Sequence, residues 1–309
     1  MAIGDDDTAF VVQFPHPGRE HVPRGDDMGW NTARHGRKFL RCHGRYIDDM
    51  NVMGDGDLVF WGEWEGPSHV LHRWRPLDRK PRVLHEPYWA TPPRGPRQNT
   101  DPWVFGPAFY YSNCKQVVDH GRRATGMQRL TPGSVIVFGS TLHGEFVVDT
   151  VFVIASAQPW SPSDSARMDL DEVFRHCTAD SLATGRDRQT RFTLYRGATA
   201  EDPINGMYSF VPARRADDPD PAFERPILQL PGLINPANKR ACRGSRRPIP
   251  LDDVRQAWDE VRQGVLDAGC VLGVRIATPS RRPHTFRPQL DPDGTAMCGA
   301  AADPAEPRC

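Results

Sequence analysis

Short apolar runs separated by turn residues dominate the first half of the chain. Thr8–Phe14 (TAFVVQF) has the pattern of a strand, and Asp57–Trp64 with His69–Trp74 around the turn Glu65–Ser68 predicts a hairpin. A second hairpin is predicted where Leu142-His143-Gly144 separates two apolar runs, Ser134–Gly139 and Glu145–Ile154.

Two stretches of this half lack such a pattern. Pro15–Asp49 is rich in Gly, Arg and His with weak periodicity, which favours a long, partly helical loop. A loop of this length is expected to have a function. Pro76–Pro96 contains six prolines, which predicts an extended path over the surface. Trp103–Asn113 has room for one or two short strands.

The second half alternates helix and strand patterns. Asp169–Ala179 is predicted to be a helix, and 251–268 gives the clearest helical signal, because apolar residues recur at helical spacing between Pro250 and the stop signal Gly269. Further strands are expected at Arg191–Arg196, Met207–Ala213, Pro226–Leu230 and Cys270–Ala277.

These patterns together predict an α+β fold. Residues 1–157 are expected to form a β-rich, barrel-like, ligand-binding part, and 158–279 a smaller α/β part packed on it. Residues 280–309 hold no core-forming run and are expected to be a disordered tail.

Composition narrows the function classes. Of the 309 residues 38% are hydrophobic, and 30 prolines with 27 glycines favour many turns and short strands. Acidic and basic residues balance at 39 each, so no overall field draws the protein to nucleic acid or to a membrane. The sequence lacks an apolar run near the roughly 20 residues of a membrane helix, and its acidic N-terminus is unlike a signal peptide. We therefore expect a cytoplasmic protein without a membrane partner.

Metal and disulfide chemistry are not indicated by the sequence. The seven cysteines are scattered, odd in number and without a C-x-x-C pair, which argues against a disulfide framework or a structural zinc site. His69 and His72 fall on opposite faces of a strand, so joint metal ligation by them is not expected. The sequence leads us to expect no metal and no cofactor.

The stretch from Gln98 to Gln116 is the richest in both aromatic rings and hydrogen-bonding side chains. Rings offer stacking area to a flat ligand, while amides and carboxylates recognise its edge. The candidate ligand-binding residues are the rings Trp61, Trp64, Trp103, Tyr110 and Tyr111 together with Asn99, Asp101, Asn113 and Lys115. The alternative is that the rings form the core of a barrel and the amides cap its turns.

A basic run, Lys239–Arg247 (KRACRGSRR), contains five basic residues and no acid. It suits a phosphate-binding loop, with Arg243, Arg246 and Arg247 as the contacts. A solvated loop before the helix is the alternative.

Two segments resemble a known group of domains. Gly56–Gly62 (GDLVFWG) and Pro132–Phe138 (PGSVIVF) are similar to the barrel strands of PUA-like domains of the EVE and ASCH group. The resemblance covers about 10–156, and Ser134 stands where that group prefers Asp. It implies a small barrel that binds RNA or modified bases, as such domains do, several of them beside nucleic-acid modification and defence systems. Pro159–Ala277 has no counterpart there.

Candidate catalytic residues are few. Cys114 adjoins Lys115, a cation that lowers a thiol pKa, and could act with His120 or His143 as base; Asp101 is the other candidate reactive group. A lone cysteine is also a common small buried residue.

A second resemblance concerns the other half of the chain. Tyr195-Arg196-Gly197 followed by Met207–Phe210 resembles the Arg and Ser strands of ADP-ribosyltransferases, which implies that Arg196 contacts phosphate. The Glu that should follow on a third strand has no match, because Glu224 is predicted to lie in a loop.

The leading functional hypothesis is recognition of a nucleobase-bearing ligand, either a modified base in nucleic acid or a free nucleotide, in a bacterial modification or defence pathway. The expected partner is thus a nucleotide or nucleic acid. The alternatives are an enzyme acting on a nucleotide-like substrate, either Cys-dependent or ADP-ribosyltransferase-like, and a structural interaction protein. The oligomeric state stays open.

Overall fold

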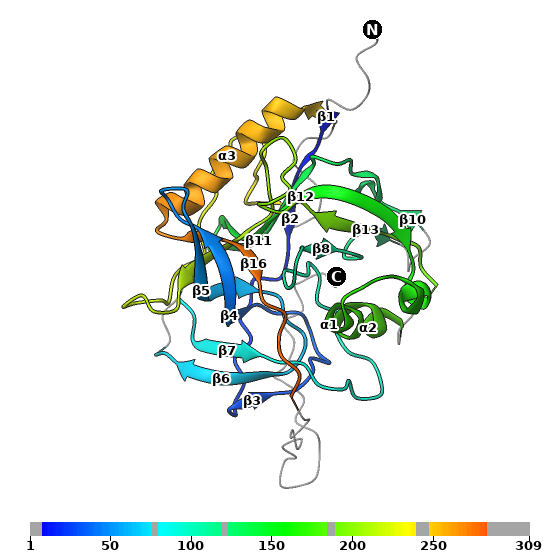
Figure 1. The fold of residues 1–309 in the computed structure, drawn as a ribbon, viewed down its shortest axis with the longest axis vertical. Coiled ribbons are helices and arrows are strands. Elements are labelled where there is room, and N and C mark those ends of the chain that lie inside the picture. Colours follow the sequence, from blue (N-terminus) through cyan, green and yellow to red (C-terminus); the bar gives the residue numbers. More distant parts are fainter. Residues whose placement is uncertain (1–7, 76–79, 119–122, 184–188, 239–246, 283–309) are drawn as a thin grey trace.

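Strands account for most of the regular structure in the computed structural model, which describes residues 8–75, 80–118, 123–183, 189–238 and 247–282 (Figure 1). The strands are β1 Thr8–Ala9, β2 Val11–Pro15, β3 Asp27–Met28, β4 Lys38–Ile47, β5 Met53–Gly62, β6 Ser68–Arg73, β7 Val83–Pro87, β8 Tyr110–Tyr111, β9 Val117–Val118, β10 Arg123–Ala124, β11 Val135–Leu142, β12 Glu145–Trp160, β13 Phe192–Gly197, β14 Val211–Arg215, β15 Ile249–Pro250 and β16 Val271–Ile276.

The helices are fewer. They are α1 Glu172–Phe174, α2 Asp180–Ala183 and α3 Leu251–Asp267, with a π-helical turn Arg175–Ala179 joining the first two and 3-10 turns at Gly126–Arg129 and Pro162–Arg167. Figure 1 shows α3 on one side of the molecule, with α1 and α2 on the other. The α+β class is confirmed, with strand in large excess.

Two sheets organise the described residues. One has the strand order β16-β14-β5-β4-β7-β6-β3, and an additional pairing of β16 with β4 closes β4, β5, β14 and β16 into a small barrel. The other has the order β2-β11-β12-β13-β8, in which β2 runs parallel to β11. The two sheets touch where Val151 of β12 bridges to Phe210, just before β14.

Alternation along the β4–β5 hairpin divides its side chains between two hydrophobic clusters. Leu40, Leu58 and Phe60 belong to the cluster that also contains β14 and β16 residues. Phe39 and Trp61, one residue out of phase, belong to the cluster that contains the buried face of α3. Because successive side chains of a strand point to opposite faces, both faces of this hairpin are core at its middle.

Strands from both predicted parts share sheets. The boundary expected near residue 157 falls inside β12, and β13 pairs with β12 while β14 pairs with β5 and β16 with β4. The barrel-like feature is therefore built jointly by the first third of the chain and by strands from 211 to 276.

The local predictions that depended on turn and cap chemistry are confirmed. β11 and β12 form the predicted hairpin, and His143 and Gly144 both have positive φ, 50° and 82°, as a two-residue hairpin turn requires. The predicted 251–268 helix is α3, which has acidic residues in its first turn and is followed by Gly269 at a φ of 72°. The helix predicted at 169–179 begins after the N-cap Asp171 and extends to Ala183.

Several predictions of pairing and loop structure are wrong. The segment Pro15–Asp49 holds β3 and the ten-residue β4 rather than a partly helical loop. β5 pairs with β4 and β14, whereas β6 pairs with β3 and β7, so the predicted hairpin between 57–64 and 69–74 does not form. The proline-rich stretch contains β7, which lies buried beside β4. The predicted hairpin replaces the non-local pairings of β5 with β14 and of β6 with β3 by a local one.

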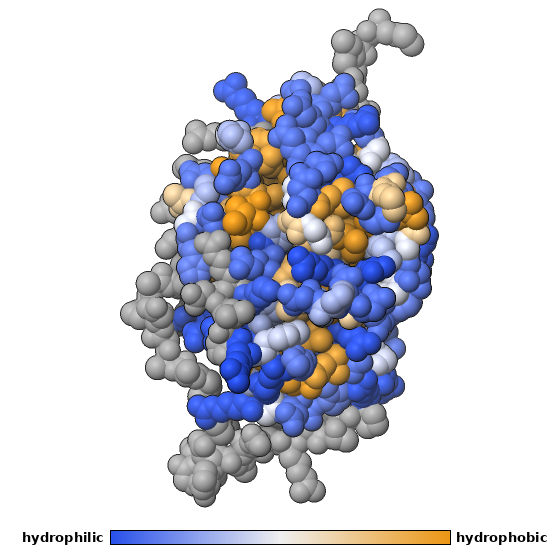
Figure 2. Space-filling model, turned by 90° about the vertical axis from the view of Figure 1, so that its left-hand side faces the viewer, coloured by the Kyte–Doolittle hydropathy of each residue, from blue (hydrophilic) through white to orange (hydrophobic). Residues whose placement is uncertain are grey.

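The predicted tail falls almost wholly outside the described residues, which end at 282. Within the ranges that the structure describes, the helices are too short or too polar to cross a membrane. The face in Figure 2 shows apolar patches separated by polar side chains.

Candidate functional site

Charged side chains converge just beyond one end of the β4–β5 ladder. The ladder pairs His43 with Asp57 and ends with Lys38 opposite Gly62. Continuing this register places Arg37 opposite Glu63 and His35 opposite Glu65. Alternation puts all four side chains on one face of the hairpin, where they contact one another.

Glu63 is the centre of this group. Its Oε2 accepts a hydrogen bond of 2.5 Å from Arg37 Nη1, and its Oε1 lies 3.1 Å from His35 Nδ1. The backbone N–H of Asp101 also donates to Oε1, at 3.3 Å. Only 5% of Glu63 is exposed, so this carboxylate depends on protein partners rather than on water.

Glu65 shares His35 with Glu63. Its Oε1 lies 2.9 Å from His35 Nδ1, while Asn31 Nδ2 donates to its Oε2. Glu65 is fully buried, and the backbone N–H of this residue donates to Thr100 Oγ1 at 3.0 Å. His35 is the more accessible member, with 15% of its side chain exposed.

His16 reaches the same carboxylate from the other sheet. Its backbone N–H donates to Gly139 O at 2.6 Å, which anchors the residue directly after β2. Gly139 sits at the β-bulge of β11, where a Cβ would lie 2.1 Å from Val147 O. The ring of His16 faces Glu63, with Nδ1 3.3 Å from Oε2, yet neither ring nitrogen makes a hydrogen bond within the described part of the chain.

A second acid–base group continues from Arg37. Arg37 Nε donates to Asp149 Oδ2 at 3.0 Å, and Arg225 Nη1 donates to Asp149 Oδ1 at 3.1 Å. Arg225 also donates to Ser140 Oγ and to Gly18 O. The residues His16, His35, Arg37, Glu63, Glu65, Asp149 and Arg225 are called the polar cluster from here on.

The polar cluster separates the pKa values of its two histidines. Burial, and then the nearby Arg37, lowers the pKa of His16 from 6.5 to about 4. Burial opposes a charge on His35 as well, but Glu63 and Glu65 outweigh it and raise the pKa of His35 well above 6.5. At neutral pH the cluster therefore holds one neutral and one charged imidazole on the two oxygens of Glu63.

The carboxylate of Glu63 is ionised under the same conditions. Burial favours its neutral form, but His35 and Arg37 hold its pKa well below the ordinary value. Burial opposes the charge on Arg37 too, and Glu63 with Asp149 raises the pKa of Arg37 above its ordinary value. Charges kept in a buried position by mutual pairing are typical of functional sites.

Four of the residues predicted from sequence lie next to the polar cluster. Asp101 accepts hydrogen bonds from the backbone N–H groups of Ser112, Asn113 and Cys114, so its carboxylate organises the 112–115 turn. Asn99 Nδ2 donates to the side-chain oxygen of Asn113, whose own amide nitrogen donates to Asp101 Oδ2 at 3.1 Å. Burial raises the pKa of Asp101 to about 6.

Lys115 connects this turn to His16. Its Nζ donates to Pro15 O and lies 4.7 Å from the centre of the Phe14 ring, which itself packs edge-on against the ring of His16. Asn99, Asn113 and Lys115 are partly exposed, so they form a rim beside the buried charges.

The predicted aromatic walls lie in the core. Trp64, Trp103 and Tyr111 are fully buried and Trp61 is 3% exposed. Trp64 packs on Trp103, Tyr111 stacks on Tyr195, and the guanidinium of Arg225 covers Trp61. Tyr110, on the edge strand β8, is half-buried against Phe174. A ligand could stack on the fully buried rings only if the core opened, so their stacking role stays a prediction.

The predicted phosphate contacts are scattered. Arg196 is an exposed residue of β13, and Arg247 is exposed before β15. Arg243 and Arg246 lie outside the described residues. The hydroxyl of Ser209, the counterpart of the ADP-ribosyltransferase serine, bonds to the backbone of Val153, and Glu224 is exposed.

Cys114 and His143, one of its two proposed bases, lie in different turns. Cys114 is half-buried, and its carbonyl accepts from the Tyr111 hydroxyl at 2.6 Å. His143 occupies the β11–β12 turn, and His120 lies outside the described ranges. A nucleophilic role for Cys114 stays a prediction.

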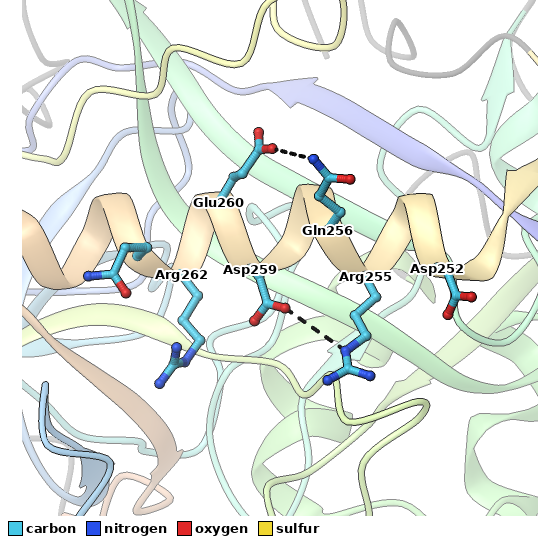
Figure 3. A pocket seen from close by; sticks show the side chains of 7 residues that line it. Asp252, Arg255, Gln256, Asp259, Glu260 and Arg262 are labelled. Carbon is cyan, nitrogen blue, oxygen red and sulfur yellow. Dashed lines mark hydrogen bonds and ion pairs between the residues drawn. The ribbon is translucent and has the colours of Figure 1, made fainter.

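The pocket in Figure 3 has a different character from the polar cluster. Its lining comes from α3 alone: Asp252, Arg255, Gln256, Asp259, Glu260, Arg262 and Gln263. These side chains pair along the helix, as Gln256 does with Glu260 at 3.1 Å and Arg255 with Asp259 at 3.9 Å. This is the solvated face of an amphipathic helix, so we do not place the functional site there.

Sequence reasoning missed every member of the polar cluster. The available signal was the alternation Gly62-Glu63-Trp64-Glu65, which puts two carboxylates on one face of a strand. Their partners come from segments predicted to be loops, so no periodicity indicated the convergence. Comparison with protein-family models, with curated proteins and with solved structures finds no match to this chain.

Proposed function

We propose that this protein recognises a nucleobase-bearing ligand, a modified base in nucleic acid or a free nucleotide, in a modification or defence pathway. The ligand's polar edge binds at the rim of the polar cluster. One observation carries this proposal: Asp101 holds Asn113 and the start of the 112–115 turn through its carboxylate, and donates its own N–H to Glu63. Asp101 thus links the amide-rich rim directly to the buried charges.

The chemistry of the rim suits a base edge. Side-chain amides such as those of Asn99 and Asn113 present a donor and an acceptor side by side, as a base edge does. Lys115 supplies a compact positive charge for a phosphate. His35 brings the only charge of the cluster with appreciable exposure among the described residues, 15% of its side chain.

The test is binding of a panel of nucleotides and short oligonucleotides, measured by titration calorimetry. Replacing Asn99 with Ala removes a base-edge contact at the rim, and we expect affinity for the best ligand to fall about tenfold, the equivalent of one hydrogen bond to a polar partner. Lys115→Met should weaken phosphate-bearing ligands more than the matching nucleosides.

A matched control lies on α3. Gln263→Ala removes an exposed amide that donates to Asp267 Oδ1 at 2.8 Å, so affinity should not change. If no member of the panel binds at millimolar concentration, the proposal fails. Equal losses in Asn99→Ala and Gln263→Ala would also contradict a site at the rim.

Polymer and mononucleotide ligands can be separated through the basic run. Replacing Arg243, Arg246 and Arg247 together with Ala should flatten the salt dependence of oligonucleotide binding by about one unit per lost phosphate contact. A mononucleotide bound at the rim would not respond. Unchanged affinity for every oligonucleotide would leave the mononucleotide form of the proposal standing.

A second candidate function, an enzyme acting on a nucleotide-like substrate, is favoured by the two histidines. A neutral His16 and a charged His35 lie on opposite oxygens of Glu63, 3.3 Å and 3.1 Å away. Titratable groups whose pKa values are pushed apart in one site suit a general base and a general acid.

Turnover separates this candidate from simple recognition. His16→Ala should abolish conversion of a bound nucleotide while changing its affinity by less than about threefold, because a proton-transfer group contributes mainly to the transition state. Cys114→Ser tests the cysteine-dependent form in the same assay. An enzyme in which Cys114→Ser is inactive and His16→Ala is active would contradict the assignment to the polar cluster.

A further inference from the structure

Three side chains of the polar cluster each point one metal-binding atom at a common place. His35 Nδ1 lies 3.1 Å from Glu63 Oε1 and 2.9 Å from Glu65 Oε1, and the three atoms all lie within 4.8 Å of one another. Donor atoms held about 2.1 Å from an octahedral ion are about 3.0 Å apart along each edge. The distances of 3.1 Å and 2.9 Å from His35 Nδ1 to the two glutamate oxygens match that edge length.

The remaining carboxylate oxygens are held away from this place by other partners. Arg37 donates to Glu63 Oε2, and Asn31 donates to Glu65 Oε2. Each glutamate therefore has one oxygen fixed by a donor and turns the other toward His35. Such an outer layer, which orients the ligands of an ion, is typical of metal sites.

His16 supplies an independent observation. Its side chain is 1% exposed and faces Glu63, yet neither of its ring nitrogens has a hydrogen-bond partner among the described residues. A buried polar group without a hydrogen-bond partner destabilises the folded protein. A bound ion, or a water on such an ion, is a common partner for such a group. The unsatisfied imidazole is on the carboxylate that would carry the ion.

We infer that His35, Glu63 and Glu65 bind one divalent first-row transition-metal ion, through one imidazole nitrogen and two carboxylate oxygens, and that His35 releases its Nδ1 proton to solvent as the ion binds. Mixed nitrogen and oxygen donors select such ions over Mg²⁺, which prefers oxygen ligands and retains its waters. The site rests on these side chains alone and does not depend on the ligand proposed above.

Three protein ligands leave coordination positions open on the side where His35 is exposed. An ion there offers two effects to a molecule at the rim: it polarises an oxygen of that molecule, and it lowers the pKa of its own bound water. The expected site is therefore of the open type rather than a closed structural one.

The test uses the untagged full chain, stripped with chelator and titrated with Mn²⁺ alone. Loss of the free-ion EPR signal should show one Mn²⁺ per chain, bound at least about tenfold more tightly than Mg²⁺ in competition. Glu65→Gln should weaken Mn²⁺ at least about tenfold, since it removes one charged ligand.

A matched control exists on the same hairpin. His43 lies 3.0 Å from Asp55 and 3.4 Å from Asp57, but all three side chains are exposed, and Arg41 already donates to Asp57 Oδ2. Asp57→Asn should bind Mn²⁺ as the original protein does. Equal losses in the two variants, or no Mn²⁺ bound at one per chain, would overturn the inference.

If the Glu65→Gln variant fails to fold, a measurement on the unaltered protein still tests the inference. Pulsed EPR of the Mn²⁺ complex should show coupling to one imidazole nitrogen, which His35→Ala should remove. A bound ion without nitrogen coupling would overturn the assignment to His35. Because no nucleotide is present in these experiments, their failure would leave the rim proposal untouched.

Discussion

Two histidine–carboxylate groups occupy opposite ends of the same β4–β5 hairpin, on the same face. At one end His43 lies between Asp55 and Asp57, with 57% of its side chain exposed. At the other end His35 lies between Glu63 and Glu65, which are 3% and 0% exposed. The residue types and the cross-strand spacing are alike, and the surroundings differ.

The difference shows that a buried charge needs partners within the protein, whereas an exposed charge is solvated by water. The exposed group is solvated, so each pair contributes little and needs no further partners. The buried group has lost its water, so every charge in it has to be paired and hydrogen-bonded by the protein. The protein supplies these partners from both sheets. This concentration of paired, buried charges in one place supports a functional role for the polar cluster.

Removing one buried charge gives the largest expected effect. Arg37→Met leaves Glu63 and Asp149 without their shared cation, and we expect the free energy of unfolding to fall by about 3–5 kcal/mol. Arg41 is the control on the same strand, because it pairs with Asp57 while 45% of its side chain is exposed. Arg41→Met should cost less than about 1 kcal/mol.

Urea unfolding followed by circular dichroism measures both variants. Similar losses for Arg37→Met and Arg41→Met would mean that the two ends of the hairpin do not differ in the way burial predicts.

The buried histidines give an effect of intermediate size on pH dependence. Burial, and then Lys38, lowers the pKa of His85 from 6.5 to about 3. The unfolded chain therefore takes up a proton at this residue below pH 6.5 that the folded chain refuses, and stability falls as the pH falls toward 3. The slope approaches about 1.4 kcal/mol per pH unit for this residue.

His85→Gln should remove this share of the acid sensitivity. Between about pH 7 and about pH 5.5 we expect the variant to lose about 1 kcal/mol less unfolding free energy than the original protein. A His85→Gln profile that is parallel to that of the original protein would contradict a neutral, buried His85.

The exposed carboxylate gives the smallest expected effect. Hydrogen bonding from Arg41 lowers the pKa of Asp57, so the contribution of Asp57 to stability is present at neutral pH and is lost as its carboxylate becomes protonated. Because Asp57 is 41% exposed, Asp57→Asn should change the free energy of unfolding by less than about 1 kcal/mol, and salt should reduce the difference. A larger loss of unfolding free energy that does not depend on salt would show that Asp57 contributes more to stability than its exposure predicts.

Part of the fold could be predicted because its signals are local. Hairpin β11–β12 was found from a turn sequence between two apolar runs, and α3 from helical spacing between Pro250 and Gly269. Prediction failed at β4, although Arg41, His43 and Arg45 alternate there with Leu40, Cys42 and Gly44, because the Gly, Arg and His content of the segment was taken to indicate a loop. It failed again at β7, which is bounded by prolines yet pairs with β4.

The candidate site was predicted only at its rim. Asn99, Asp101, Asn113 and Lys115 were found from their density in one short stretch, where they do lie close together. The aromatic residues of the same stretch were expected beside them, but a strand or turn sends neighbouring side chains in different directions, and these rings pack in the core.

The sequence by itself determined where strands alternate, where the long helix begins and ends, and that Glu63 and Glu65 share a face. Those properties depend on backbone geometry within a few residues. Only the tertiary structure decided that His16, His35 and Arg37 meet those glutamates and that Asp149 and Arg225 extend the group beyond Arg37, because these contacts join residues up to 112 positions apart. Burial at one end of the hairpin and exposure at the other was likewise decided by packing, since one histidine and two carboxylates stand at each end.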